Sequence, residues 1–159
     1  MNKKVNKSLP RQVYILLTLY AGNKEPIHDQ LRLEKLLFLV QKEVIEGKGL
    51  NLSIEDYNFR AYKYGPFTEE VYDDVWRLKE LGLVNIEERG DTKIFSLTEV
   101  GVKLVENILR ENENAQKVLR AIEEIKKRWN KKDIKELLKY VYRNYPEYTE
   151  KSLIKHILE

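Results

Sequence analysis

Two stretches in the first third of the chain have apolar residues at helical spacing. Residues 10–21 predict a buried first helix that ends at Gly22. Residues 31–47 carry a wide apolar face and predict a second helix, capped by Asp29. Residues 23–30 between them predict a connector. The apolar positions are Val13, Leu16, Leu17 and Tyr20 in the first helix and Leu33, Leu36, Leu37, Val40 and Val44 in the second.

The middle of the chain changes from an extended to a helical pattern and back. Residues 53–67 alternate up to Gly65-Pro66 and predict a short strand or extended segment that ends in a turn. Thr68 stands at a helix N-cap position, and a third helix follows up to Gly82. Residues 83–88 and 93–97 predict a β-hairpin. The apolar residues of the third helix recur at Val71, Val75, Leu78 and Leu81.

The remaining chain predicts helices. Thr98 caps a helix, residues 111–116 are either its continuation or a joint, and later helices are interrupted at Asn130 and Pro146. Three helices, a hairpin and a further helix predict a mainly α fold of the winged helix-turn-helix type with C-terminal helices. We expect a winged-helix domain at residues 1–112 and a helical tail at residues 113–159.

The tail has more apolar surface than a small winged domain can easily cover, which favours a homodimer. Its apolar positions are Ile122, Ile125, Trp129, Ile134, Leu137, Leu138 and Val141.

Composition favours a cytoplasmic protein. The 159 residues include 42% apolar residues, enough for a core, and no cysteine for a disulfide or a thiol nucleophile. Enrichment in Lys, Glu and Ile is typical of intracellular proteins, including thermophilic ones. No segment reaches the roughly 20 apolar residues that a membrane-spanning helix needs, so we expect no membrane association.

Charge is distributed unevenly along the chain. Residues 66–91 hold eight acids and three bases, a net −5, whereas residues 117–143 hold ten bases and four acids, a net +6. A basic segment of this kind can attract a polyanion, although a lysine-rich helix face is more often simply solvated.

Enzymatic motifs are missing, so we expect no enzyme, cofactor or metal. His28 and His156 lack partners at metal-ligand spacing, and no glycine loop is placed to hold phosphate. Carboxylates four residues apart, Glu69 with Asp73 and Glu70 with Asp74, could share a cation such as Mg²⁺. Their position near a helix N-terminus explains them better, because the helix dipole favours anions there.

The segments LRLEKLLFLVQKE and YNFRAYKYGPFTEEVYDDVWRLKELGLV resemble the YwgA-type family and, more distantly, the phage-associated Panacea proteins found with toxin–antitoxin systems. The resemblance covers about residues 29–98, and its most specific part is the aromatic-Tyr-Gly-Pro-aromatic turn from Tyr62 to Phe67. It implies a winged-helix scaffold without a catalytic role and, on the Panacea side, an antitoxin that binds a partner protein.

Two functions are compatible with these patterns. The first is a DNA-binding transcriptional regulator, which the fold analogy favours and which would contact double-stranded DNA mainly through phosphates. The predicted contacts are Lys3, Lys4, Lys7, Arg11, Arg60, Lys63, Arg89, Lys93, Lys126, Lys127, Arg128, Lys131 and Lys132.

The alternative is a protein-interaction module, antitoxin-like or an adaptor, that docks a basic partner on the acidic helix 68–81. Trp76 would be an interface anchor, although its pattern favours a core tryptophan that packs on the tail. The predicted interaction residues are Glu69, Glu70, Asp73, Asp74 and Trp76.

Overall fold

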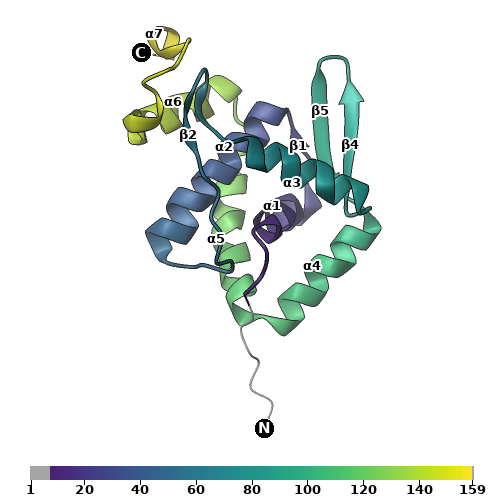
Figure 1. The fold of residues 1–159 in the computed structure, drawn as a ribbon. Helices are drawn as coiled ribbons and strands as arrows, with labels where there is room; N and C mark the ends of the chain where they lie inside the picture. Colours follow the sequence, from purple (N-terminus) through teal and green to yellow (C-terminus); the bar gives the residue numbers. More distant parts are fainter. Residues whose placement is uncertain (1–7, 159) are drawn as a thin grey trace.

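Most of the chain is helical, as the periodicity of its apolar residues predicts. The computed structural model describes residues 8–158, which form a mainly α-helical fold with a small antiparallel β part (Figure 1). In chain order the elements are α1 (Gln12–Lys24), β1 (Ile27–His28), α2 (Gln30–Leu39), the π-helical η1 (Val40–Glu46), β2 (Arg60–Tyr62), β3 (Gly65–Phe67), α3 (Glu69–Glu80), β4 (Val84–Arg89), β5 (Thr92–Leu97), α4 (Glu99–Glu111), α5 (Glu113–Trp129), α6 (Ile134–Asn144), the 3₁₀-helical η2 (Pro146–Tyr148) and α7 (Lys155–Leu158).

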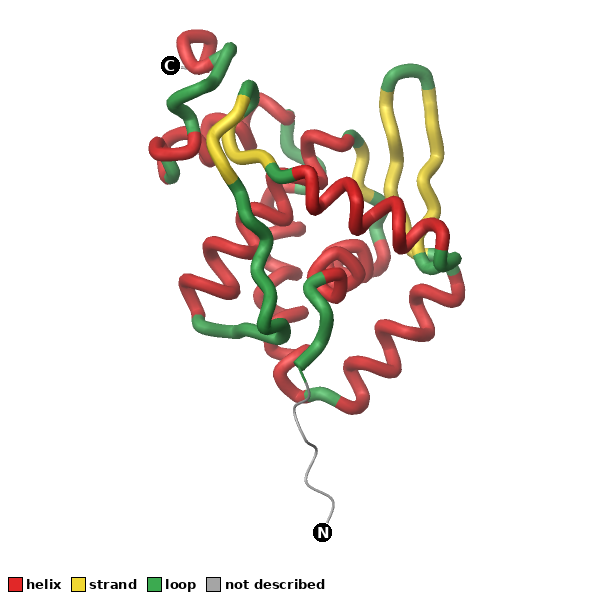
Figure 2. Tube along the Cα trace, viewed as in Figure 1, coloured by secondary structure: helices red, strands yellow, loops and turns green. Residues whose placement is uncertain are grey.

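The predicted hairpin forms, and it gains a third strand. β4 and β5 pair in antiparallel register from Val84 opposite Leu97 to Arg89 opposite Thr92. β1 pairs with the other edge of β5, giving the order β1-β5-β4. This short strand lies inside residues 23–30, so the prediction of a plain connector there is wrong. The free end of the β4–β5 hairpin projects from the helical body (Figure 2).

Side-chain caps fix the helix starts at the predicted residues. Asp29, Thr68 and Thr98 accept hydrogen bonds from the first backbone N–H groups of α2, α3 and α4. The predicted first helix ends at Gly22, whereas α1 extends to Lys24 with a break inside it. Gly22 and the two residues after it have φ values of 65°, 56° and 63°. These left-handed residues break the regular helix and turn the chain towards β1.

The C-terminal helices fold back on the rest of the chain. α5 packs along α1 and also contacts α2 and α4, while α6 packs on α2. Asn112 separates α4 from α5 and caps α5 through the N–H of Ala115. Six of the seven apolar tail side chains are buried within the single chain, namely Ile122, Ile125, Trp129, Leu137, Leu138 and Val141. The argument for a homodimer from uncovered apolar surface is therefore wrong.

No helix within residues 8–158 combines the length and the apolar character that crossing a membrane requires.

Candidate functional site

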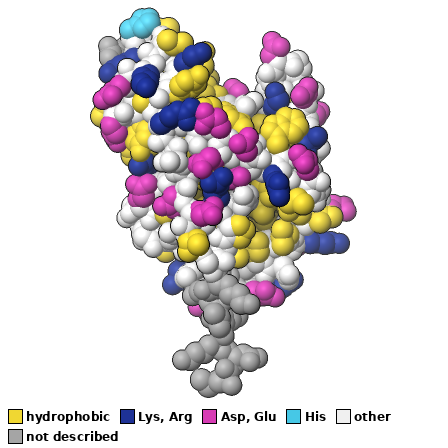
Figure 3. All heavy atoms as spheres, in the orientation of Figure 1, with side chains coloured by type: hydrophobic (Ala, Val, Ile, Leu, Met, Phe, Trp, Pro, Cys, Tyr) yellow, Lys and Arg dark blue, Asp and Glu magenta, His cyan; other side chains and the backbone are white. Residues whose placement is uncertain are grey.

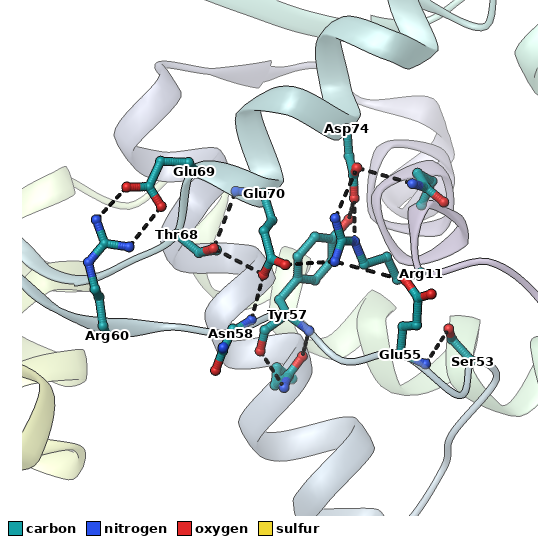
Figure 4. Close-up of polar contacts among 12 residues, drawn as sticks. Arg11, Ser53, Glu55, Tyr57, Asn58, Arg60, Thr68, Glu69, Glu70 and Asp74 are labelled. Atoms are coloured by element: carbon teal, nitrogen blue, oxygen red, sulfur yellow. Dashed lines mark hydrogen bonds and ion pairs between the residues drawn. The ribbon is translucent and has the colours of Figure 1, made fainter.

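The acidic helix α3 is tied to the start of α1 by a polar network centred on Asp74 (Figure 4). Arg11 Nε donates to Asp74 Oδ2 at 2.8 Å, and Gln12 Nε2 donates to Asp74 Oδ1 at 3.0 Å. The hydroxyl of Tyr57 donates to Asp74 Oδ2 at 2.7 Å. Asp74 is only 6% exposed, so this predicted interaction residue is buried inside the chain and does not lie on an open acidic face.

Tyr57 is itself held in place by η1. Gln41 Oε1 accepts from the Tyr57 N–H at 3.1 Å, and Gln41 Nε2 donates to the Tyr57 carbonyl at 3.0 Å. Burial, followed by the charge of Asp74, raises the pKa of the Tyr57 hydroxyl well above its ordinary value. Tyr57 therefore stays protonated and acts as a hydrogen-bond donor to the carboxylate.

The same arginine neutralises a second carboxylate. Arg11 Nη1 donates to Glu70 Oε2 at 2.8 Å, and the other oxygen of Glu70 accepts from the Asn58 N–H at 2.8 Å. The hydrogen bond to Asp74 is the main cause of a raised pKa at Arg11. The guanidinium faces α3 and is bound by two of its carboxylates, so the contact of Arg11 with DNA stays a prediction that these ion pairs disfavour.

Glu69 at the start of α3 is paired as well, although on the surface. Both its carboxylate oxygens accept from the guanidinium of Arg60 in β2 (Figure 4). These hydrogen bonds lower the pKa of Glu69 to about 2. Arg60 thus has an acidic partner inside the chain. Of the four predicted interaction carboxylates, Asp73 has no ion-pair partner among residues 8–158 and is exposed.

This arrangement suits structural linkage more than chemistry. Arginine and hydroxyl donors occupy the carboxylate oxygens that a cation would need. In the described part of the chain, no three or more His, Cys, Asp or Glu side chains group as metal ligands would. The network joins α1, the segment after η1 and α3, and so fixes the direction in which α3 presents its C-terminal half.

An exposed apolar patch lies where α3 meets α4. We define it by Leu81, Val100 and Leu104, which are 64%, 60% and 36% exposed. Figure 3 shows hydrophobic side chains gathered on this part of the molecule. The exposure of Leu81 differs from its expected place on the buried face, because the residue follows the last helical turn of α3.

Close backbone packing brings the two helices of the patch together. The hydroxyl of Thr98 donates to the Gly82 carbonyl at 2.6 Å, and the Thr98 N–H donates to the Leu83 carbonyl at 3.1 Å. A Cβ at Gly101 would lie 2.1 Å from the Leu83 carbonyl oxygen. Any side chain would clash at this distance, so the close packing requires glycine at this position.

Trp76 lies on α3 before the patch. It is 39% exposed, and the Lys79 ammonium stands 5.0 Å from its ring centroid. A tryptophan with this exposure leaves part of its ring available to a partner.

Lys126 has a different environment from its basic neighbours. It is 2% exposed, and its ammonium donates to the carbonyls of Leu19, Ala21 and Glu25 at 3.1, 2.7 and 2.6 Å. Burial lowers its pKa to about 8. The prediction that Lys126 contacts DNA is therefore wrong, because the side chain closes the broken end of α1 instead.

The other predicted DNA contacts are scattered. Lys127, Arg128, Lys131 and Lys132 are exposed at the end of α5 and just beyond it. Arg89 pairs with Glu87 on the hairpin, whereas Lys93 on β5 and Lys63 near β2 form no ion pair within the described range. Lys3, Lys4 and Lys7 lie outside the described residues.

Sequence reasoning missed one buried ion pair. Lys35 on α2 donates to Glu34 Oε1 at 2.6 Å and to the Pro66 carbonyl at 2.8 Å, and both charged side chains are buried. Burial lowers the pKa of Lys35 and raises that of Glu34. The signal was present, because these charges interrupt an otherwise apolar run. The hydrogen bond from Lys35 to Pro66 anchors β3 to α2.

A comparison with curated proteins finds no match. The family model for the antitoxin SocA-like, Panacea domain matches residues 33–158, from α2 to the last turn of α7. The match includes α3, its junction with α4 and the whole of α5, and it spans well over half of the chain. The chain therefore belongs to the antitoxin SocA-like, Panacea domain family.

Proposed function

We propose that this protein is a non-catalytic, antitoxin-like protein that binds a partner protein through the apolar patch between α3 and α4. The observation that carries the proposal is the exposure of Leu81, Val100 and Leu104 at one packed junction. Exposed apolar residues that adjoin one another mark interaction sites more often than isolated ones do. Family membership supports a protein as the partner, since an antitoxin acts on a toxin protein.

The ion pairs of α3 favour an apolar docking contact over the charged contact with a basic partner that the sequence of the acidic helix suggested. Glu69, Glu70 and Asp74 are bound to arginines of the same chain, so little of their charge is available to a basic partner. Charged residues around the patch are of both signs, with Lys79 and Lys103 near Glu80 and Glu99. We therefore propose an apolar contact with a polar rim, and Trp76 beside it as a further anchor.

A crosslinking and capture experiment tests this proposal. A photoreactive amino acid at Leu104 should crosslink one partner protein in the source cells. Tagged wild-type protein should capture that partner, and the double variant Leu81→Asp/Val100→Asp should lose it. Ile54→Asp is the matched control, because Ile54 is an exposed apolar residue in the segment after η1 and lies near Asn112, beyond the end of α4 opposite the patch. The patch is wrong as the docking site if the double variant, shown folded by circular dichroism, captures as much partner as Ile54→Asp does.

The antitoxin-like role is tested separately with the captured partner. Expression of the partner alone should slow growth, and co-expression of the wild-type chain should restore it. The double variant should fail to restore growth. A partner that leaves growth unchanged would argue for an adaptor in place of an antitoxin.

Binding of double-stranded DNA is a second candidate function, favoured by a different observation. The outer face of α5 carries exposed cations, in contrast to the internally paired acids of α3. The order α1-β1-α2-α3-β4-β5, with the sheet order β1-β5-β4, supports a winged-helix scaffold for this function. The start of α3 is a poor contact for DNA, because its carboxylates would approach phosphates. Transcriptional regulation remains part of this second proposal.

A further inference from the structure

Six exposed cations follow one side of α5 and the turn after it. We call them the α5 cationic row: Lys117, Arg120, Lys127, Arg128, Lys131 and Lys132. The spacing within α5 is three, seven and one residues, which keeps the side chains on the outer face of a helix whose inner face packs on α1. At about 1.5 Å per residue, the helical part of the row from Lys117 to Arg128 extends about 16 Å.

Most of the row is not neutralised by the protein's own acids. Lys117, Arg120, Lys127 and Lys132 form no ion pair with any residue between 8 and 158, and Lys131 pairs with Glu25 at 3.2 Å. The Arg128 guanidinium lies 4.7 and 4.8 Å from the ring centroids of Trp129 and Tyr140, which holds it in a fixed orientation.

Acidic residues near the row offset it only in part. The Glu123 carboxylate accepts from the Gly22 N–H, and Asp133 caps α6 through the Lys135 N–H. Glu113 and Glu124 are the exposed carboxylates of α5 itself. Six cations against these four acids leave the surface with a net charge of +2.

We propose that the α5 cationic row binds the phosphates of double-stranded DNA without reading its sequence, an inference that rests on the second proposed function. Phosphates along one DNA strand are spaced about 3.4 Å along the axis, so a helical row of about 16 Å faces roughly five of them. A rigid helix keeps its cations at a fixed spacing, and arginine and lysine side chains can adjust to the phosphates from there.

The positions of the exposed apolar side chains argue against a membrane surface or an acidic protein as the partner of the row. The exposed large hydrophobic residues of the described chain lie on other elements: Ile54, Tyr62, Tyr64, Trp76, Leu81, Val100, Leu104, Leu153 and Ile157. A helix that binds a membrane surface needs an apolar face to bury, and a protein interface needs an apolar centre. The row provides neither, whereas DNA binding depends chiefly on charge.

The row and the apolar patch lie on separate helices. α3 and α5 pack on different sides of α1 (Figure 1), and the patch belongs to the far end of α3 and the start of α4. Variants of one surface can therefore be made without altering the other.

The test is fluorescence anisotropy with a labelled random duplex at salt concentrations from about 50 to 200 mM. Wild-type protein should bind with a steep salt dependence. Arg120→Ala/Lys127→Ala should reduce the slope of log affinity against log salt by about 1.8, since each lost phosphate contact contributes about 0.9. Lys79→Ala/Lys103→Ala, which removes the same charge from exposed sites on α3 and α4, is the matched control and should leave the slope unchanged.

The outcomes separate the inference from the function on which it rests. No binding of wild-type protein at low salt would overturn DNA binding altogether. Binding that is equally weakened in the α5 and control variants, or unchanged in both, would overturn the assignment to the α5 row and leave DNA binding itself in place. Wild-type protein that binds anionic phosphatidylserine vesicles and no duplex would show that the row serves a membrane surface instead.

Discussion

The helices α3 and α5 carry net charges of opposite sign, and the charged side chains of the two helices have different surroundings. Three of the four acids at the start of α3 are bound by arginines of the same chain. On α5 the exposed cations mostly face solvent, and Lys126 alone is buried. The acids fix the position of a helix, whereas the bases remain available to a partner.

The difference comes from residues far away in the sequence. Arg11 lies 63 residues before Asp74 and reaches it only because α1 packs beside α3. Within residues 8–158, the exposed cations of α5 and the turn after it form one ion pair, between Lys131 and Glu25. A run of like charge therefore indicates a binding surface only when the fold supplies no counter-charge. The following variants test this distinction, from the largest expected effect to the smallest.

Replacing Arg11 by Met should destabilise the protein most. It would leave Asp74 as a buried carboxylate with only Tyr57 and Gln12 as donors, and loss of one partner from a buried ion pair costs about 3 to 5 kcal/mol. We expect the lower end, about 3 kcal/mol, because the Arg11 side chain is partly exposed. Urea denaturation measures the change. Arg120→Met is the control on α5 and should change the free energy of unfolding by less than about 0.5 kcal/mol.

Replacing Lys126 by Met should have the next largest effect. The change removes the donor to three backbone carbonyls at the end of α1 and should lower the free energy of unfolding by about 2 kcal/mol. Lys127→Met alters an exposed neighbour and should cost less than about 0.5 kcal/mol. Equal values for the two variants would contradict the distinction between a structural and a free lysine on α5.

Much of the fold could be predicted from local sequence signals. Caps at Asp29, Thr68 and Thr98, together with apolar periodicity, located the starts of α2, α3 and α4. The two-residue strand β1 could not be predicted, because so short a strand has no periodicity and exists only by pairing with β5. The break in α1 had Gly22 as a signal, but its closure by Lys126 depends on packing between distant helices.

The candidate site was less predictable than the fold. Helical spacing alone placed Asp74 with the exposed acids, since nothing near it in sequence indicates Arg11 or Tyr57 as partners. It also placed Leu81 with the core, although α3 ends just before that residue. The apolar patch combines residues from two helices whose junction depends on Gly101, so no single segment of the sequence displays it.

Replacing Tyr57 by Phe should have an intermediate effect within the acidic network. Asp74 would lose one of its donors but keep the ion pair with Arg11, so we expect a loss of about 1 kcal/mol. Tyr64→Phe removes a hydroxyl from an exposed tyrosine and should be within about 0.5 kcal/mol of wild type. A loss for Tyr57→Phe as large as that for Arg11→Met would mean that the hydroxyl, and not the ion pair, is the main support of Asp74.

Acid titration of the exposed ion pair between Arg60 and Glu69 should give the smallest change in the free energy of unfolding. This pair includes a residue of α3 but is exposed, like the cations of α5. The pKa of Glu69 is about 2 in the folded protein, below its ordinary value of 4.5, so folding favours the ionised carboxylate. Its stabilising contribution is complete above pH 4.5 and is lost as the pH falls towards 2. The difference in free energy of unfolding between wild type and Glu69→Gln should therefore be small at neutral pH, since solvent screens the pair, and should vanish in acid. A difference that stays constant over this range would mean that Glu69 does not pair with Arg60 in solution, and its charge at the start of α3 would then be as available to a partner as the charges of the α5 cationic row.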